Sequence, residues 1–463
     1  MIYNHPSDYP IKDKLQSYKR LKRRRGNQGT KNRRSYRDVI CAFDIETTRL
    51  EDVEQSIMYV WQFQIGDDTI IGRTWDEFLT LLQELKEELS GDYLLCFVHN
   101  LSYEFQFLRG VYPFTEEEVF IIRDRKILKC EMYEAVEFRC SYLQTNMSLD
   151  EFTHRMGVKH AKTSMDYNVK RYPWTPIDDI KEYIVNDVAG LVEAMRVRIY
   201  GQGDNLYTVP LTSTGYVRRE AKRAMRHYNR GRLLKQLPDP ELYMMLREAF
   251  RGGNTHANRY YAGQIIKDVL SYDRSSSYPD CQCNDKYPMG IWYKESSPDI
   301  NYLLDNLMGR RAALFRICLV NVRLKDRSWG FPYLARDKCR KIANGTWDNG
   351  RILSCDYCET TMTDVDLRIL VSEYKFDDAW LLDLCHTRYG TLPEPLTNLT
   401  KEYYKKKTEL KGVVGAELAY MRAKELLNSV YCMGCLCKIH ASKVLNILMG
   451  SMWRDRTRWK SLS

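Results

Sequence analysis

Short, almost entirely apolar runs alternate with helical patterns between residues 39 and 200, and this alternation constrains the fold more than any other feature. Val39–Phe43 and Tyr93–Val98 are apolar at successive positions, as in strands that are covered on both faces. Trp75–Leu89 has the pattern of an amphipathic helix. Another helix is expected after Thr175-Pro176, where the threonine can cap it and the proline suits its first position. The alternation predicts an α/β domain over residues 39–200.

The helix expected after residue 176 carries one apolar stripe. Its members are Ile180, Ile184, Val188, Leu191 and Met195. On a helical wheel Asp187 falls about 60° from the centre of this stripe, so its side chain should point to the interior edge of the domain. Tyr183 lies one turn earlier on the same face.

Carboxylates stand at or just after the ends of three of these elements. Asp44 and Glu46 lie two residues apart at the end of the first strand and therefore share a face. Glu104 follows the second strand, and Asp187 lies on the helix. Carboxylates from separate elements are the hard oxygen ligands of Mg²⁺. Two such ions would suit the hydrolysis of a phosphodiester, with Tyr183 orienting the attacking water. Each acid taken alone is more simply explained as a solvated surface residue.

The ordered set resembles the three exonuclease motifs of family B DNA polymerases, and specifically of their protein-primed branch from phages and linear plasmids. Asp44-Ile-Glu46 matches the first motif, and Tyr183 with Asp187 matches the third. The second motif is matched by Asn100, Tyr103 and Glu104, although the family usually has Asp at the last of these positions. Ser148-Leu149 resembles a family element that contacts single-stranded DNA, and Lys162 resembles the catalytic lysine of the exonuclease site.

A second group of motifs extends the same resemblance beyond residue 205. Tyr272-Asp273-Arg-Ser-Ser276-Ser-Tyr278-Pro279 resembles the polymerase motif Asp-x-x-Ser-Leu-Tyr-Pro and follows Val269-Leu270, which we expect to be a short strand. The resemblance implies that Asp273 binds both catalytic metals and that Tyr278 excludes a 2′-hydroxyl from the nucleotide site. Without the family, Asp273 is an acid in a turn.

Residues 401–431 predict a helix, a break near Gly412–Gly415 and a second helix. In the second helix Lys424, Asn428 and Tyr431 share a face. They resemble the family's fingers motif Lys-x-x-x-Asn-Ser-x-Tyr-Gly, with Cys432 in place of the glycine. Phe250-Arg-Gly-Gly253 resembles the Tyr-x-Gly-Gly element that grips the template, with Phe for Tyr.

The resemblance implies a role for each matched residue. The metal ligands are expected to be Asp44, Glu46, Glu104, Asp187 and Asp273, and the further catalytic residues Lys162 and Tyr183. Nucleotide binding is expected at Tyr278, Lys424, Asn428 and Tyr431. DNA contacts are expected at Asn100, Tyr103, Ser148, Leu149, Phe250, Arg251, Gly252, Gly253 and Ser276.

The resemblance also implies a fold: an α/β ribonuclease H-like 3′–5′ exonuclease domain, then an α+β polymerase palm with a helical fingers hairpin. The expected parts are a basic arm (1–38), the exonuclease domain (39–200), the first part of the palm (201–290), an insertion that resembles the terminal-protein-contacting region (291–396), the fingers (397–432) and the start of a second insertion (433–463). After Tyr431 the sequence has one carboxylate side chain, Asp455, whereas family members continue with an Asp-Thr-Asp motif and a thumb. We therefore expect a truncated or split polymerase that lacks the thumb and polymerises poorly or not at all.

Positive charge is concentrated at the N-terminus. Residues 1–38 contain 12 Lys and Arg against 3 Asp and Glu, which accounts for +9 of the net +10. Such an arm can neutralise phosphates and release counterions, or it can be a disordered tail, and both readings stay open. The sequence contains 14 cysteines and no secretory signal, so free thiols are expected. Cys355-x-x-Cys358 and Cys432-x-x-Cys435 could suit zinc, but we favour buried apolar roles.

The resemblance implies a protein-primed DNA-directed DNA polymerase with 3′–5′ exonuclease proofreading that replicates a linear phage or plasmid genome. Its expected cofactors are two Mg²⁺ ions per active site, with Mn²⁺ as a substitute. The expected partners are single-stranded 3′ ends, primer–template DNA, dNTPs and a terminal protein. No apolar run approaches the roughly 18 residues of a membrane span, and we expect a protein of the host cytoplasm. We also expect a monomer. Two alternatives stay open: a stand-alone 3′–5′ exonuclease, and a non-catalytic module that binds DNA or the terminal protein.

Overall fold

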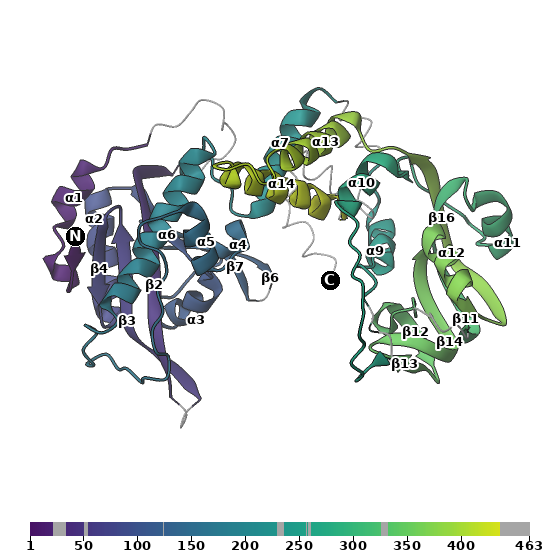
Figure 1. The fold of residues 1–463 in the computed structure, drawn as a ribbon, viewed down its shortest axis with the longest axis horizontal. Helices are drawn as coiled ribbons and strands as arrows, with labels where there is room; N and C mark the ends of the chain where they lie inside the picture. Colours follow the sequence, from purple (N-terminus) through teal and green to yellow (C-terminus); the bar gives the residue numbers. More distant parts are fainter. Residues whose placement is uncertain are drawn as a thin grey trace. The chain divides into compact units, whose positions relative to one another are not determined.

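The computed structural model describes residues 1–21, 34–50, 54–123, 125–228, 236–255, 257, 261–325 and 332–435. Contacts between residues divide the chain into two compact units, Met1–Tyr216 and Val217–Ser463, called here the N-terminal and C-terminal units (Figure 1). None of the helices that the structure describes is both long and apolar enough to cross a membrane.

The N-terminal unit is built on an eight-stranded mixed sheet with the order β1-β4-β3-β2-β5-β8-β7-β6. Its central strand β2 is parallel to β5 and antiparallel to β3, and β5 is parallel to β8. The strands are β1 (Ile2–Tyr3), β2 (Ser35–Leu50), β3 (Gln55–Ile65), β4 (Asp68–Gly72), β5 (Asp92–Val98), β6 (Val119–Arg123), β7 (Lys126–Met132) and β8 (Val136–Cys140).

Successive residues of β2 lie in different cores, which confirms a strand that is covered on both faces. Cys41 and Phe43 belong to one core with Phe78 of α2, whereas Ile40 and Ala42 belong to another that contains three of the five stripe residues of α6. The prediction of an α/β fold in this region is therefore confirmed. The helices of the unit are α1 (Ile11–Ser17), α2 (Trp75–Leu89), α3 (Leu101–Val111), α4 (Tyr142–Thr145), α5 (Leu149–Met156) and α6 (Lys181–Gly201), with a 3₁₀ turn η1 (Pro6–Asp8).

Helix α6 begins later than the sequence predicted, at Lys181. The expected cap at Thr175-Pro176 is wrong because Thr175 is used in a separate turn, where its hydroxyl accepts a hydrogen bond from the backbone N–H of Tyr172 at 2.9 Å. Its carbonyl accepts another from Arg73 at 2.7 Å. The apolar stripe itself is confirmed, since all five of its residues are buried.

The prediction that residues 1–38 form a basic arm is wrong for the residues that the structure describes. Strand β1 pairs with β4, and Leu15 of α1 is only 1% exposed in the same core as Phe43. The segment has many charged residues and few buried apolar ones, so its sequence shows no clear helical or strand periodicity. Lys22–Arg25, Lys31 and Arg33 lie outside the described residues.

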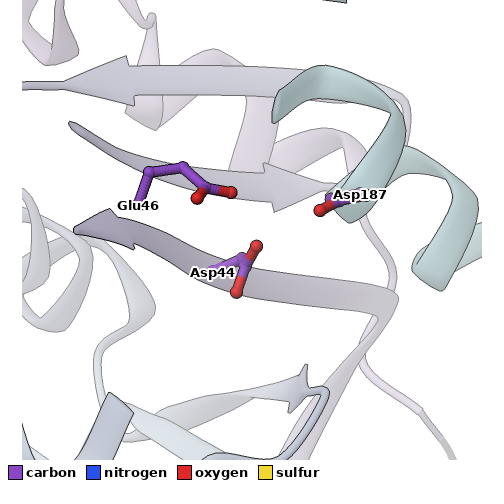
Figure 2. Close-up of side chains that lie close together, drawn as sticks. All are labelled: Asp44, Glu46 and Asp187. Carbon is purple, nitrogen blue, oxygen red and sulfur yellow. The ribbon is translucent and has the colours of Figure 1, made fainter. Parts of the chain in front are cut away.

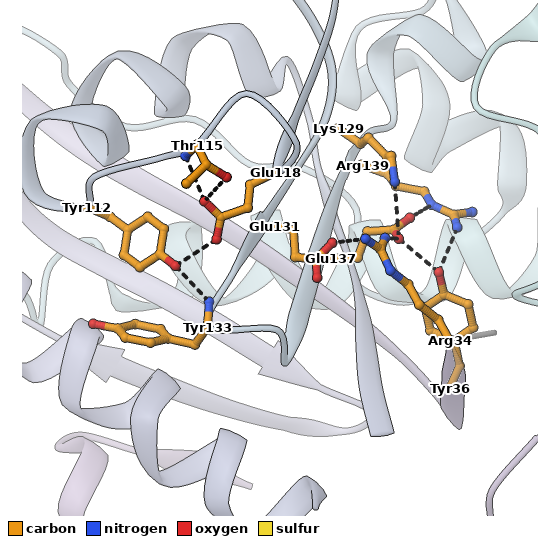
Figure 3. Close-up of polar contacts among 10 residues, drawn as sticks. All are labelled: Arg34, Tyr36, Tyr112, Thr115, Glu118, Lys129, Glu131, Tyr133, Glu137 and Arg139. Carbon is orange, nitrogen blue, oxygen red and sulfur yellow. Dashed lines mark hydrogen bonds and ion pairs between the residues drawn. The ribbon is translucent and has the colours of Figure 1, made fainter. Parts of the chain in front are cut away.

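Arg34 and the start of β2 are held by a charged network on β7 and β8 (Figure 3). The Arg34 guanidinium forms ion pairs with Glu131 and Glu137, and Glu137 also accepts a hydrogen bond from Tyr36 at 2.9 Å. Burial opposes the charge on Glu137, but its cationic neighbours, Arg139 first, lower its pKa to about 2. Arg34 is thus a structural residue and not part of a free arm.

The C-terminal unit contains an antiparallel sheet with the order β10-β16-β11-β14-β12, to which β13, β15 and β9 are added at β14, β11 and β16. Its main core lies between these strands and α12, and includes Phe315, Met362 and Leu370. The strands are β9 (Tyr287–Pro288), β10 (Tyr293–Lys294), β11 (Arg311–Leu324), β12 (Cys339–Ala343), β13 (Thr346–Asp348), β14 (Arg351–Thr363), β15 (Tyr374–Lys375) and β16 (Asp378–Gly390). The helices are α7 (Ser213–Ala224, which crosses the boundary), α9 (Pro240–Ala249), α10 (Ser277–Asn284), α11 (Ile300–Tyr302), α12 (Asp364–Glu373), α13 (Glu394–Glu409) and α14 (Glu417–Cys435), with short turns η2 (Met225–His227), η4 (Leu303–Leu307) and η5 (Arg336–Lys338).

The helical hairpin predicted near residues 401–431 is confirmed as α13 and α14, with Gly412 and Gly415 at positive φ between them. The short strand predicted at Val269-Leu270 is wrong. These two side chains are 68% and 76% exposed, and their segment pairs with no strand in the described part of the chain. An extended apolar segment becomes a strand only when a neighbour satisfies its backbone N–H and C=O groups.

Candidate functional site

Three carboxylates from β2 and α6 meet in the N-terminal unit (Figure 2). One oxygen each from Asp44, Glu46 and Asp187 can be chosen so that all lie within 4.8 Å of one another. Asp44 and Glu46 continue the series of Ile40 and Ala42, whose side chains face α6. The alternation of β2 therefore directs both acids toward the helix that carries Asp187, as the sequence predicted.

Glu104, on the first turn of α3, joins this group. Glu104 is 3% exposed, and its pKa is raised by burial first and then by the charge of Asp44, so the two carboxyls lie close together. One oxygen of Glu104 and one of Asp187 are buried without a hydrogen-bond partner. Unpaired buried carboxylate oxygens cost free energy, and a divalent cation would satisfy them. The four acids thus fit the Mg²⁺ or Mn²⁺ ions that the sequence implied, and they are hard oxygen ligands of the right kind.

Burial raises the pKa of each of these acids, and repulsion from neighbouring acids adds to the shift at Asp44, Glu46 and Glu104. Burial and the Asp187 charge raise the pKa of Asp44 to about 7. Burial, with the charges of Asp44 and Asp187, raises the pKa of Glu46 to about 9. Burial also raises the pKa of Glu104 and of Asp187. The site favours protonated acids until a cation compensates their charge.

Lys162 supplies the positive charge that the described structure places in this group. Its Nζ lies 2.6 Å from an Asp187 carboxylate oxygen and 3.2 Å from the Tyr183 hydroxyl. Burial opposes the charged ammonium, but Asp187 outweighs it and raises the pKa of Lys162. Tyr183 also exchanges a hydrogen bond with Tyr167 at 3.1 Å. The structure therefore brings Lys162, Tyr183 and Asp187 together, as the motifs implied.

Two neighbours of the acids were missed in the sequence. Gln62 of β3 is paired with Asp44 across the sheet, and its amide donates to an Asp44 oxygen at 3.2 Å. Only knowledge of the strand register could have identified it. No role was predicted for Tyr167, whose hydroxyl lies 3.1 Å from that of Tyr183, although it follows Lys162 by five residues.

The expected DNA contacts of this unit lie around the acids in different settings. Asn100 begins α3 with a φ of 74°, and the Tyr103 hydroxyl lies 2.5 Å from that of Thr47. Ser148 caps α5 by accepting the N–H of Glu151 at 3.1 Å, and Leu149 is 8% exposed in a core. The structure gives Ser148 and Leu149 structural roles, and DNA contacts at all four residues stay predictions.

In the C-terminal unit the motif around Asp273 surrounds the start of α10. Asp273 is exposed, and among the described residues it belongs to no close group of possible metal ligands. Ser276 accepts a hydrogen bond from Lys407 of α13 at 2.9 Å. Lys407 was not singled out, although its lysine-rich helix was a signal. The Tyr278 hydroxyl lies 3.5 Å from where a Cβ would stand on Gly253, so the two motifs meet.

Helix α14 presents Lys424 and Asn428 to solvent, while Ala423 and Leu427 are buried. The side chain of Tyr431 lies outside the described residues. Helix α10 packs against both α13 and α14, so the elements that carry Tyr278 and Lys424 are in contact.

The Phe-Arg-Gly-Gly element follows α9, and two of its residues make internal contacts. Phe250 packs on the core of α9, and Arg251 donates to the Thr361 carbonyl at 3.3 Å and lies 3.4 Å from Asp366. Gly252 and Gly253 are exposed. A DNA contact by this element stays a prediction.

The described cysteine pair lies beside a third thiol, since the Cys358 side chain interacts with those of Cys355 and Cys339. Cys355 and Cys358 are buried in the core of the C-terminal sheet. The side chains of Cys432 and Cys435, and all of Cys437, lie outside the described residues.

Comparison with known proteins decides the family. The family described as DNA polymerase type B, organellar and viral, matches residues 168–432, which is more than half of the chain. The chain belongs to this family. The type B polymerase match includes the motifs around Asp187, Asp273 and Lys424, and it begins after Asp44 and Glu104. The resemblance to family B DNA polymerases is therefore confirmed. No curated protein matches the chain.

Solved structures of Phi29 DNA polymerase share the fold of this type B polymerase. The structure with single-stranded DNA has a TM-score of 0.66 at 17% identity and covers 86% of this chain and 68% of its own. The structure with primer–template DNA has a TM-score of 0.67 at 17% identity and the same coverage, 86% and 68%. The ternary complex with incoming nucleotides has a TM-score of 0.61 at 16% identity, again with 86% and 68% coverage. At such identities the likeness is one of fold.

Proposed function

We propose that the N-terminal unit of this type B polymerase is a 3′–5′ exonuclease that removes the terminal nucleotide of single-stranded DNA. The observation that carries the proposal is the meeting of Asp44, Glu46 and Asp187 within 4.8 Å, with Glu104 beside them. Buried acids of this kind have no structural use without a cation, because their mutual repulsion destabilises the fold.

The acids would hold two Mg²⁺ or Mn²⁺ ions through Asp44, Glu46, Glu104 and Asp187. When bound, such ions stabilise the attacking and leaving oxygens of a phosphodiester displacement. The protein itself supplies orientation. The Lys162 ammonium lies 3.2 Å from the Tyr183 hydroxyl, and in this proposal Tyr183 would hold the attacking water. Lys162 also holds one oxygen of Asp187, which restricts the rotation of that carboxylate.

For the whole chain we propose a protein-primed DNA-directed DNA polymerase with proofreading, which replicates a linear phage or plasmid genome in the cytoplasm of its host. Family membership supports polymerisation, and the fold is shared with Phi29 polymerase structures that hold single-stranded DNA, primer–template DNA and incoming nucleotides. In this proposal a terminal protein supplies the primer, and the monomeric chain binds dNTPs. Its nucleotide site comprises Asp273, Tyr278, Lys424, Asn428 and Tyr431.

A stand-alone exonuclease is the second candidate. The observation that favours it is the isolation of Asp273, which has no close group of ligating side chains among the described residues. Nucleotidyl transfer by two metals requires more than one carboxylate in the palm. In this case the C-terminal unit would hold DNA without extending it.

One experiment separates these functions. The full chain is incubated with Mg²⁺ and 3′-labelled single-stranded DNA, and in parallel with a primed template and dNTPs. Digestion that disappears in the double variant Asp44→Ala, Glu46→Ala supports the exonuclease, and extension of the primer supports the polymerase. Binding of the DNA without digestion or extension would contradict both and leave the non-catalytic module.

A further inference from the structure

The lysine of the candidate exonuclease site lies on a segment without regular structure. Residues 157–180, all of which are described, contain neither helix nor strand, yet this segment carries both Lys162 and Tyr167. An ammonium group is held in one place only if its backbone is held as well. The contacts of this segment with α6 show how that is done.

Glu193 of α6 binds the segment at two consecutive backbone N–H groups. One of its carboxylate oxygens accepts from Lys159 at 2.9 Å and from His160 at 3.2 Å. The other oxygen lies 2.7 Å from Nδ1 of the His160 ring. Burial opposes the charge of Glu193, but these hydrogen bonds, the His160 side chain first, lower its pKa. One carboxylate thus satisfies three groups of the segment.

Gly190 brings the segment into direct contact with the helix. A Cβ at this position would stand 2.0 Å from the carbonyl oxygen of His160, so only glycine allows this approach. The backbone N–H of Lys162 points to the Thr153 hydroxyl of α5 at 3.4 Å. The segment therefore runs along α6. His160 contacts Glu193 and Gly190, and Lys162 contacts Asp187.

We propose that Glu193, through His160, is the positioning residue that holds the Lys162 ammonium against Asp187 and Tyr183. Neither residue belongs to the motifs that identified the site. The spacing supports this role, because Asp187 and Glu193 lie on one helix, six residues or about 9 Å apart. Its effect on catalysis rests on the proposed exonuclease function, whereas its effect on the position of Lys162 does not.

The first test measures the position of Lys162 without using activity. Acetic anhydride labels lysines according to their exposure and pairing, and mass spectrometry of the full chain gives the rate at Lys162 relative to Lys181. In Glu193→Leu we expect this ratio to rise by about tenfold, as is typical when a supporting side chain is removed. In Glu193→Gln, which keeps an acceptor oxygen, the ratio should stay near that of the unaltered protein. Asp150→Asn is the matched control, because Asp150 lies 3.0 Å from His154 on α5 in an exposed pair.

The second test measures catalysis on 3′-labelled single-stranded DNA. Glu193→Leu should lower kcat by about tenfold and leave KM unchanged, and Glu193→Gln should restore kcat. In a Lys162→Ala background, Glu193→Leu should cause no further loss, since it acts through that lysine.

The outcomes separate the two proposals. An unchanged labelling ratio in Glu193→Leu, or full additivity with Lys162→Ala, would overturn the positioning role. A changed ratio in a protein that digests no DNA would support the positioning role and overturn the exonuclease.

Discussion

At the scale of single residues, the N-terminal unit is defined by acids that are costly to bury together. Asp44, Glu46, Glu104 and Asp187 lie close together in a buried site with one ammonium, that of Lys162. A fold keeps such a group only when something compensates its charge. Two predictions follow from this imbalance.

The stability of the metal-free protein should fall as the pH rises. The folded-state pKa values of about 7 for Asp44 and about 9 for Glu46 lie above those of an unfolded chain, so the folded protein binds more protons and loses stability between about pH 4 and pH 9. Mg²⁺ should therefore raise the Tm by several degrees at pH 8.5 and by less at pH 5.5, since about 1 kcal/mol corresponds to about 2–4 °C here. Thermal unfolding in EDTA and in Mg²⁺ measures this. In the variant Asp44→Asn, Glu46→Gln the dependence on pH should be weaker, and an equal Mg²⁺ effect at both pH values would contradict the argument.

Glu104 stands where the family usually has Asp, and its charge should still bind metal. Glu104→Gln keeps the volume and a hydrogen-bonding oxygen but removes the charge, so the Mg²⁺ concentration for half-maximal digestion should rise by at least about tenfold. Glu118→Gln is a suitable control, because Glu118 accepts hydrogen bonds from Tyr112 and Thr115 and does not belong to the group of acids (Figure 3). An unchanged Mg²⁺ requirement would remove Glu104 from the ligand set.

At the scale of elements, one helix organises the whole candidate site. Helix α6 contributes Tyr183 and Asp187 to it, packs part of its stripe on β2, and contacts the Lys162 segment through Gly190 and Glu193. Its 21 residues are buried over much of their length on several sides. A substitution on α6 where it contacts the Lys162 segment should therefore shift Lys162 relative to the acids.

Gly190→Ala tests that contact. The new methyl group would meet the His160 carbonyl at 2.0 Å, so the segment must move away and take Lys162 with it. We expect a loss of about 1–3 kcal/mol in the free energy of unfolding and a reduction in the rate of digestion. Gly201→Ala is the matched control at the end of the same helix, where no atom lies within 4 Å of the new Cβ. Urea unfolding and the digestion assay measure both, and equal behaviour of the two variants would contradict the close approach.

At the scale of the molecule, the chain consists of two units with separate sheets and separate cores. The N-terminal unit contains all four candidate metal ligands of the proposed exonuclease. The ion pair between Arg34 and Glu137 also joins two residues of this unit. The C-terminal unit contains Asp273, Tyr278 and Lys424.

Residues 1–216 should therefore fold and digest single-stranded DNA without the rest of the chain. Cooperative thermal unfolding and digestion by this fragment, abolished by Asp44→Ala, are the expected results. A fragment that folds cooperatively but leaves the DNA intact would show that the C-terminal unit is needed for catalysis or for binding the 3′ end.

The local sequence pattern was sufficient to predict α2, β5 and the apolar stripe of α6. The hydrophobic periodicity of a helix or strand is visible in residues that are close together in the sequence. The local pattern was also enough for the acids, since their order along the chain matches the family motifs. The folded N-terminus around Leu15 was missed because charged neighbours hid a few apolar positions. The prediction of a strand at Val269-Leu270 was wrong because a strand forms only where a neighbouring strand can pair with its backbone, and apolar side chains alone do not provide that partner.

The amino-acid sequence by itself determined which chemistry this protein carries: acids, a lysine and a tyrosine in the order of a type B polymerase. Only the tertiary structure decided how they are held. Gln62 reaches Asp44 through strand register, and Glu193 reaches the Lys162 segment through a helix approach that a single glycine permits. Such contacts join residues far apart in the chain, so no local pattern of residues encodes them.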